Sequence, residues 1–262
     1  MADKLVSMNF LTPIVVIDHK DTEDKDLFLP LAQLRTQLPK YLSDPQIGKS
    51  AQAVLANLSE YEAFAKQQFA TAAGMEIDYI GIYHIGGDDN DPVFRRSQAE
   101  QKELLEHYPY DIISWEGSSS DHVTWDSLAD EAMAEAKNMG VTVTRQAIMR
   151  AVRTKTELDG VLMYYGQHPK ANLTGGEDPA LLNLNVVIQE LSGMSKVRAA
   201  ELEELTRSVV AARSLIALAR MISQMRLQNL HTGVIVMGYG HAQDFNTLFG
   251  TLGTKSRIFA AI

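Results

Sequence analysis

The chain of 262 residues contains no cysteine, which excludes disulfides, thiolate metal sites and cysteine nucleophiles. It has no apolar run of the roughly 18 residues that a membrane helix needs, and residues 1–10 lack the apolar core of a signal peptide. We therefore expect a cytoplasmic protein without a membrane partner. A formal net charge of −9, with no basic block, predicts that nucleic acid is not a partner either.

Three common catalytic signatures are also missing. The sequence has no Gly-x-x-x-x-Gly-Lys-Ser/Thr phosphate loop, no Gly-x-Ser-x-Gly nucleophile elbow and no His-Glu-x-x-His zinc helix. Serines 118–120 occur together, but their surroundings match no known nucleophile context. These absences argue against P-loop NTPases, elbow-type serine hydrolases and zincins.

The chain does contain a regular alternation of strand-like and helix-like segments. The predicted strands are 13–18, 78–84, 111–116, 160–165, 233–241 and a short one near Ile258. The predicted helices are 50–73, 97–108 with Ser97 as N-cap, 125–138, 146–156, 195–229 and 244–249. This order predicts an α/β fold with a mainly parallel central sheet flanked by helices. Residues 1–75 are predicted to be a mostly helical N-terminal appendage or cap, and residues 76–262 the α/β core domain.

Two of the predicted strands end in the same short motif. Gly81-x-x-His84 and Gly238-x-x-His241 each follow an apolar, β-prone run, and the two histidines are 157 residues apart (241 − 84). Parallel strands present their carboxyl ends at one edge of the sheet, where α/β proteins bind ligands. Both imidazoles are therefore expected at a shared edge, although a single histidine at such a place can also be a plain hydrogen-bonded residue.

Carboxylates and an arginine complete the candidate site. Glu116 follows an apolar run and precedes Gly-Ser-Ser-Ser, so it either faces a cleft or is an anion near the start of the next helix. Glu177, with Asp178 as second candidate, lies in a glycine-rich loop that is also typical of a turn or cap. Arg213 borders the apolar stripe of the long helix and can pair with carboxylates or an oxyanion, with Arg220 as its rival.

The order of these motifs resembles the superfamily that joins TraB/PrgY proteins, Tiki proteases, erythromycin esterases and ChaN-like haem-binding proteins. The resemblance covers roughly residues 76–262. It implies site roles for five residues: His84, Glu116, Glu177, Arg213 and His241. The first 75 residues match nothing recognisable in that superfamily, so the resemblance does not transfer a substrate.

Such a set predicts a hydrolase of an ester or of an amide or peptide bond. Water would be activated by His84 or Glu116 as general base, or by a divalent ion (Mn, Co or Zn) held by His84, Glu116 and His241. The expected partner is a small-molecule or peptide substrate, and a homo-oligomer is possible. The alternatives are a noncatalytic ChaN-like protein that binds haem or another small ligand, and a scaffold that has lost the reaction.

Overall fold

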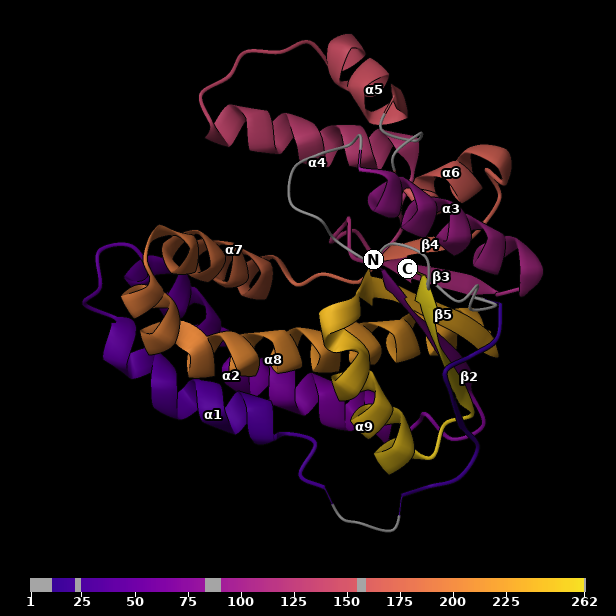
Figure 1. Ribbon diagram of the computed structural model, residues 1–262, viewed down its shortest axis with the longest axis horizontal. Helices are drawn as coiled ribbons and strands as arrows, with labels where there is room; N and C mark the ends of the chain where they lie inside the picture. The colour runs from indigo at the N-terminus through magenta and orange to yellow at the C-terminus, as the bar shows by residue number, and fades with distance from the viewer. Residues whose placement is uncertain (1–10, 22–24, 83–90, 155–158, 262) are drawn as a thin grey trace, which may run out of the picture.

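The computed structural model describes residues 11–21, 25–82, 91–154 and 159–261, and it has the predicted α/β architecture (Figure 1). One sheet has the strand order β1-β6-β2-β5-β3-β4. Its strands are β1 (Val15–Ile17), β2 (Glu76–Ile82), β3 (Ile112–Trp115), β4 (Leu173–Gly175), β5 (Thr232–Gly238) and β6 (Ser256–Ala261). β1 pairs antiparallel with β6, and the other pairings are parallel. The prediction of a mainly parallel sheet is confirmed.

Helices cover both faces of this sheet (Figure 1). One face is covered by α3 (Pro92–His107), α4 (Trp125–Asn138), α5 (Arg145–Thr154) and α6 (Gly160–Gln167). The other face carries α1 (Leu29–Gln37), η1 (Leu38–Tyr41), α2 (Gly48–Phe69), α7 (Pro179–Met194), α8 (Lys196–Gln228), η3 (Tyr239–His241) and α9 (Ala242–Leu252). Successive β5 side chains alternate between the two cores: Val234 and Val236 face the first, Ile235 and Met237 the second. This explains why β5 reads as a continuous apolar run.

The N-terminal helices share their core with the long helix α8. Leu31 of α1 and Leu58 of α2 are in the same buried cluster as Leu218 of α8. β1 also precedes residue 75 and extends the common sheet. The predicted domain boundary at residue 75 stays a prediction, but the described residues before it share a hydrophobic core and a sheet with those after it.

Several segments differ from the sequence prediction, among them residues 239–241 at the end of the predicted strand 233–241, which form η3 instead. Residues 160–165 were predicted to be a strand and form the helix α6 instead. The Asp159 side chain accepts a hydrogen bond from the Leu162 N–H and caps the helix, while Val161, Leu162 and Tyr165 bury one helical face. The strand next to β3 is instead formed further along the chain by β4, outside the predicted strands.

The start of α3 also differs from the prediction. Asp91, not Ser97, is the N-cap, and its carboxylate accepts from the Val93 N–H at 2.8 Å, with Pro92 at the first helical position. Ser97 lies one turn inside the helix and donates to the Ala261 carbonyl at 2.6 Å. The Asp-Pro pair is the stronger start signal because it combines a side-chain acceptor with a preset φ angle.

None of the helices in the described ranges is both long enough and apolar enough to cross a membrane.

Candidate functional site

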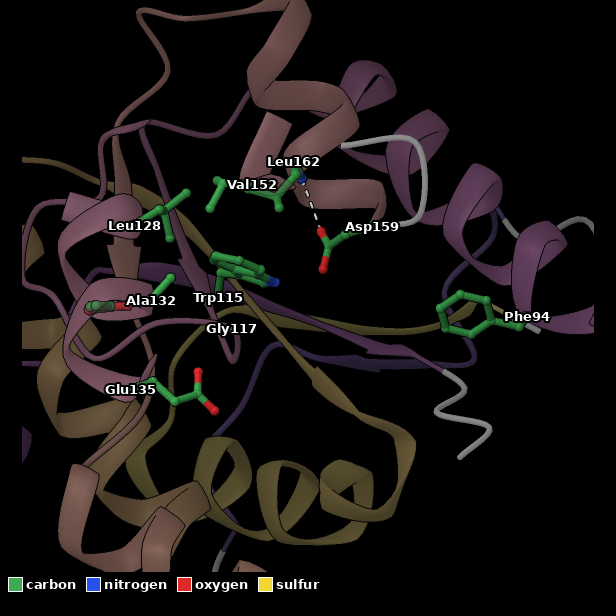
Figure 2. A pocket seen from close by; sticks show the side chains of 10 residues that line it. Phe94, Trp115, Gly117, Leu128, Ala132, Glu135, Val152, Asp159 and Leu162 are labelled. Carbon is green, nitrogen blue, oxygen red and sulfur yellow. Dashed lines mark hydrogen bonds between the residues drawn. The ribbon is translucent and has the colours of Figure 1, made fainter. Parts of the chain in front are cut away.

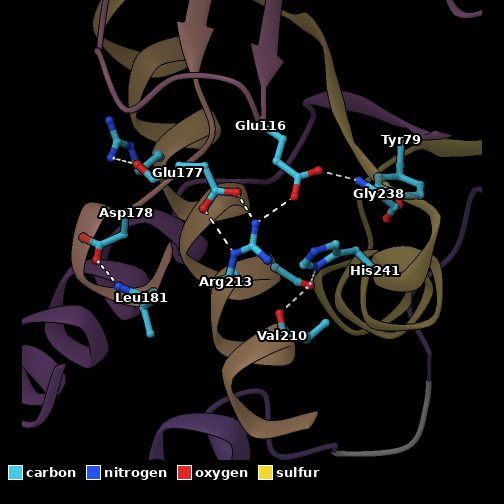
Figure 3. A network of polar contacts seen from close by, with 11 residues as sticks. Tyr79, Glu116, Glu177, Asp178, Leu181, Val210, Arg213, Gly238 and His241 are labelled. Carbon is cyan, nitrogen blue, oxygen red and sulfur yellow. Dashed lines mark hydrogen bonds and ion pairs between the residues drawn. The ribbon is translucent and has the colours of Figure 1, made fainter. Parts of the chain in front are cut away.

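Polar side chains gather at the carboxyl edge of the sheet. Glu116 directly follows β3, Glu177 follows β4, and His241 follows β5 in η3. Arg213 reaches them from the middle of α8 (Figure 3). β2 and β5 are parallel neighbours, with Ile82 opposite Gly238, so their carboxyl ends share this edge.

His84 lies outside the described residues, so its predicted place in the site stays a prediction.

Arg213 is the centre of a buried ion-pair network (Figure 3). Its Nη2 donates to Glu116 Oε1 at 2.7 Å and also to Glu177 Oε1, and its Nε donates to Glu177 Oε2 at 3.2 Å. The side chains of Arg213 and Glu177 are only 4% and 1% exposed, against 18% for Glu116. The network therefore ties the ends of β3 and β4 to α8 in a place that excludes most water.

The charges in this network perturb one another. Burial alone would lower the pKa of Arg213, but its contacts with Glu177 and Glu116 outweigh burial and raise the pKa. Burial raises the pKa of Glu177, and the contact with Arg213 opposes that rise only in part. One cation thus serves two carboxylates, and each of them depends on it.

The second oxygen of Glu116 positions the end of β5. Glu116 Oε2 accepts from the Gly238 N–H at 2.6 Å, and the Tyr79 hydroxyl donates to the Gly238 carbonyl, also at 2.6 Å. A Cβ on Gly81 would lie 3.1 Å from the rings of both Tyr79 and Tyr239, so the glycine of the first motif allows this close packing. Gly81 therefore has a packing role, while Gly238 is held through its backbone N–H and carbonyl.

His241 is 4% exposed and belongs to a second polar chain. Its Nδ1 lies 2.8 Å from Ser214 Oγ, and Ser214 Oγ lies 2.9 Å from Asp244 Oδ2. The Ser214 hydroxyl has one proton and also lies 3.1 Å from the Val210 carbonyl, so when it donates to Asp244 or to Val210 its oxygen accepts from the Nδ1–H of His241. This arrangement fixes the imidazole tautomer with Nε2 as the basic nitrogen.

Asp244 is a partly buried carboxylate in the first turn of α9, and burial raises its pKa, while the Ser214 hydrogen bond opposes the rise. A raised pKa means that the folded state holds the proton more tightly than the unfolded chain, so stability is lost as the pH rises through the raised value. We expect Asp244→Asn to remove this loss. The unfolding free energy of the variant minus that of the native protein should therefore become more positive as the pH increases from about 4 to about 7.

Urea unfolding followed by circular dichroism across this pH range measures the gain. Glu190→Gln, which removes one carboxylate at an exposed position on α7, is the control measured in parallel. A constant difference for Asp244→Asn would contradict the expectation.

Two of the rival residues have structural roles. Asp178 caps α7, accepting from the N–H groups of Ala180 and Leu181 at 3.0 Å, and receives the Tyr61 hydroxyl at 2.6 Å. Arg220 donates to the backbone carbonyls of Glu177 and Ser119 and pairs with Asp121. Neither side chain makes a hydrogen bond to the side chains of Glu116, Glu177 or His241 in the described ranges.

Sequence reasoning missed Ser214 and Asp244. Ser214 directly follows Arg213, and Asp244 follows His241 by three residues, so each is close in sequence to a predicted site residue. A helical reading of residues 241–244 would have placed His241 and Asp244 on one face.

The described part of the predicted metal-ligand set fits a metal poorly. Both Glu116 oxygens already accept hydrogen bonds, one from a cationic guanidinium, which repels a second cation. Among the residues that the structure describes, no group of three or more histidines or carboxylates is placed to hold a metal ion. The set of His84, Glu116 and His241 stays a prediction because His84 lies outside the described residues.

Comparison of the chain with protein-family models, with curated proteins and with solved structures finds no match.

Proposed function

We propose that this protein is a hydrolase of ester or amide bonds, with His241 as general base and Arg213 as oxyanion donor. One observation carries the proposal: Arg213 and Ser214 are consecutive on α8 and Ser214 contacts His241, so groups suited to both roles come from neighbouring elements at the carboxyl edge of the sheet. Across the described ranges, Nη1 of Arg213 has no hydrogen-bond partner, and Figure 3 shows this third nitrogen of the guanidinium turned towards His241.

In this mechanism Nε2 of His241 takes a proton from water, and the resulting hydroxide attacks the substrate carbonyl. The carbonyl oxygen becomes negatively charged and accepts from Nη1 of Arg213, a donor that the two glutamates hold in place beforehand. When the intermediate collapses, the imidazolium returns its proton to the leaving group. Asp244, acting through Ser214, stabilises the imidazolium in between.

Glu116 and Glu177 are positioning residues in this proposal rather than bases. Each makes charge-assisted hydrogen bonds that would be lost if it took a proton from water. The resemblance to erythromycin esterases and Tiki proteases agrees with a hydrolytic reaction on a carbonyl. A role for His84 as a second base remains part of the proposal.

A screen of p-nitrophenyl esters and peptide libraries tests the reaction class, with and without added Mn or Co. Turnover of at least one ester or peptide by the native protein is expected. Absence of turnover from every member of both libraries would contradict the proposal.

Ser214→Ala tests the chain from His241 to Asp244. Turnover should fall about 10- to 100-fold, because the imidazole loses the partner that fixes its tautomer. The unfolding free energy should also fall by about 1–3 kcal/mol, because buried polar groups lose their hydrogen-bond partner. Initial rates on the substrate found in the screen measure the first effect, and urea unfolding measures the second.

Ser208→Ala is the matched control, since Ser208 is also buried on α8 and also donates to the carbonyl four residues before it. It should lose stability but keep turnover. Equal turnover for the two variants would assign Ser214 a purely structural role.

A further inference from the structure

A cavity of about 460 Å³ lies on the face of the sheet that α3–α6 cover, beside the carboxyl end of β3 (Figure 2). Trp115 of β3 lines it in the middle, with Leu128 of α4 and Leu162 of α6 among the apolar side chains around the indole. Its volume is within the range of cavities that bind small molecules. This cavity takes no part in the proposed reaction, which uses the α8 side of the edge.

The aromatic wall of the cavity is fixed by the local sequence. A Cβ on Gly117 would lie 1.9 Å from Cζ2 of Trp115, so only glycine at this position lets the indole occupy its place. Trp115 is 7% exposed and packs within the core of that face. The ring is thus a rigid surface, which lowers the entropy lost on binding.

The charged side chains among the described residues that line the cavity are all acidic. Glu131, Glu135 and Asp159 line it, and the described lining residues include no lysine, arginine or histidine. Two of the three carboxylates are held in place: Glu131 accepts from the Ser118 hydroxyl at 2.9 Å, and Asp159 from the Leu162 N–H at 3.0 Å. A ligand that enters this cavity therefore meets oriented acceptors with negative charge.

We propose that the cavity binds an organic cation, namely an amine that carries an aromatic or other apolar group. The ammonium would lie among the carboxylates and near the face of the Trp115 indole, which attracts cations, and the apolar group would contact Leu128 and Leu162. The excess of one charge selects against anions of the same shape. This binding does not depend on the proposed hydrolysis.

The test compares three ligands of similar size that differ in charge: 2-phenylethylamine, 2-phenylethanol and 3-phenylpropanoate. Binding to the full chain is measured by calorimetry at low salt, and by tryptophan fluorescence in a Trp125→Phe background that leaves Trp115 as the single tryptophan. The amine should bind about tenfold more tightly than the alcohol, and the carboxylate more weakly than both. Added salt should weaken amine binding selectively.

The double variant Glu131→Gln/Glu135→Gln keeps the shape of the lining and removes two charges. Its affinity for the amine should fall to that of the alcohol, while Glu103→Gln, at an exposed position on α3 outside the lining, should bind as the native protein does. Unfolding midpoints confirm that each variant is folded. The proposal is overturned if the amine does not bind saturably, if the alcohol binds equally well, or if the double variant retains full amine affinity.

Discussion

Replacement of Arg213 by methionine should cost about 3–5 kcal/mol of unfolding free energy. The substitution keeps much of the apolar stem but leaves the buried Glu177 and the partly buried Glu116 without their shared cation. Burial already raises the pKa of Glu177 with the arginine present, so an unpaired charge there is expensive. Because domains are stable by only about 5–15 kcal/mol, a loss of this size is readily seen in urea unfolding.

The double variant Arg213→Met/Glu177→Gln separates the loss of the ion pair from the loss of packing. It should be more stable than Arg213→Met alone, because one of the stranded charges is gone. Arg207→Met is the matched control on the same helix: its pairing with Glu203 is exposed and should contribute less than about 1 kcal/mol. An Arg213 variant that loses no more than the Arg207 variant would show that the buried network does not stabilise the fold.

Replacement of His241 by glutamine should lower turnover by about 100- to 10,000-fold, the usual contribution of a general base. Glutamine is similar in length and retains a polar group near Ser214, so the unfolding free energy should change far less than the rate. Steady-state kinetics on the substrate found in the screen, with unfolding measured in parallel, separate the two effects.

His231 offers a control on the same strand. It precedes β5 by one residue, at the opposite end from His241, and its side chain is exposed. His231→Gln should therefore keep native turnover. A His241→Gln variant with native turnover would remove His241 from the mechanism, whereas loss of turnover in both variants would point to a change in the strand rather than in the base.

The sequence predicted the central strands well because their physical signal is local. β3 and β5 are buried on both faces, so each appears as a run without charged residues, and β2 has such a run after Asp78. The segment 160–165 is also an uninterrupted apolar run, and for so short a stretch apolarity alone cannot distinguish a strand from a buried helix. The decisive signal is Asp159 as an N-cap directly before the segment, which the strand prediction did not use.

The candidate site was predicted in part for a similar reason. Glu116, Glu177 and Arg213 were singled out from strand ends, a loop and a helix face, and the structure brings the three together. The chain through Ser214 and Asp244 was not predicted because it joins side chains from α8 and α9, 30 residues apart, with no short motif. Contacts of this kind depend on how two helices cross, which sequence spacing does not encode.

The two outermost strands have a further consequence for assembly. β1 and β4 form the borders of the sheet, and each is only three residues long. Such short edge strands have few backbone groups that could pair with another polypeptide, which protects against intermolecular strand addition and aggregation. A homo-oligomer of this protein is therefore expected to associate through its helical surfaces, not by extending the sheet from one subunit into the next.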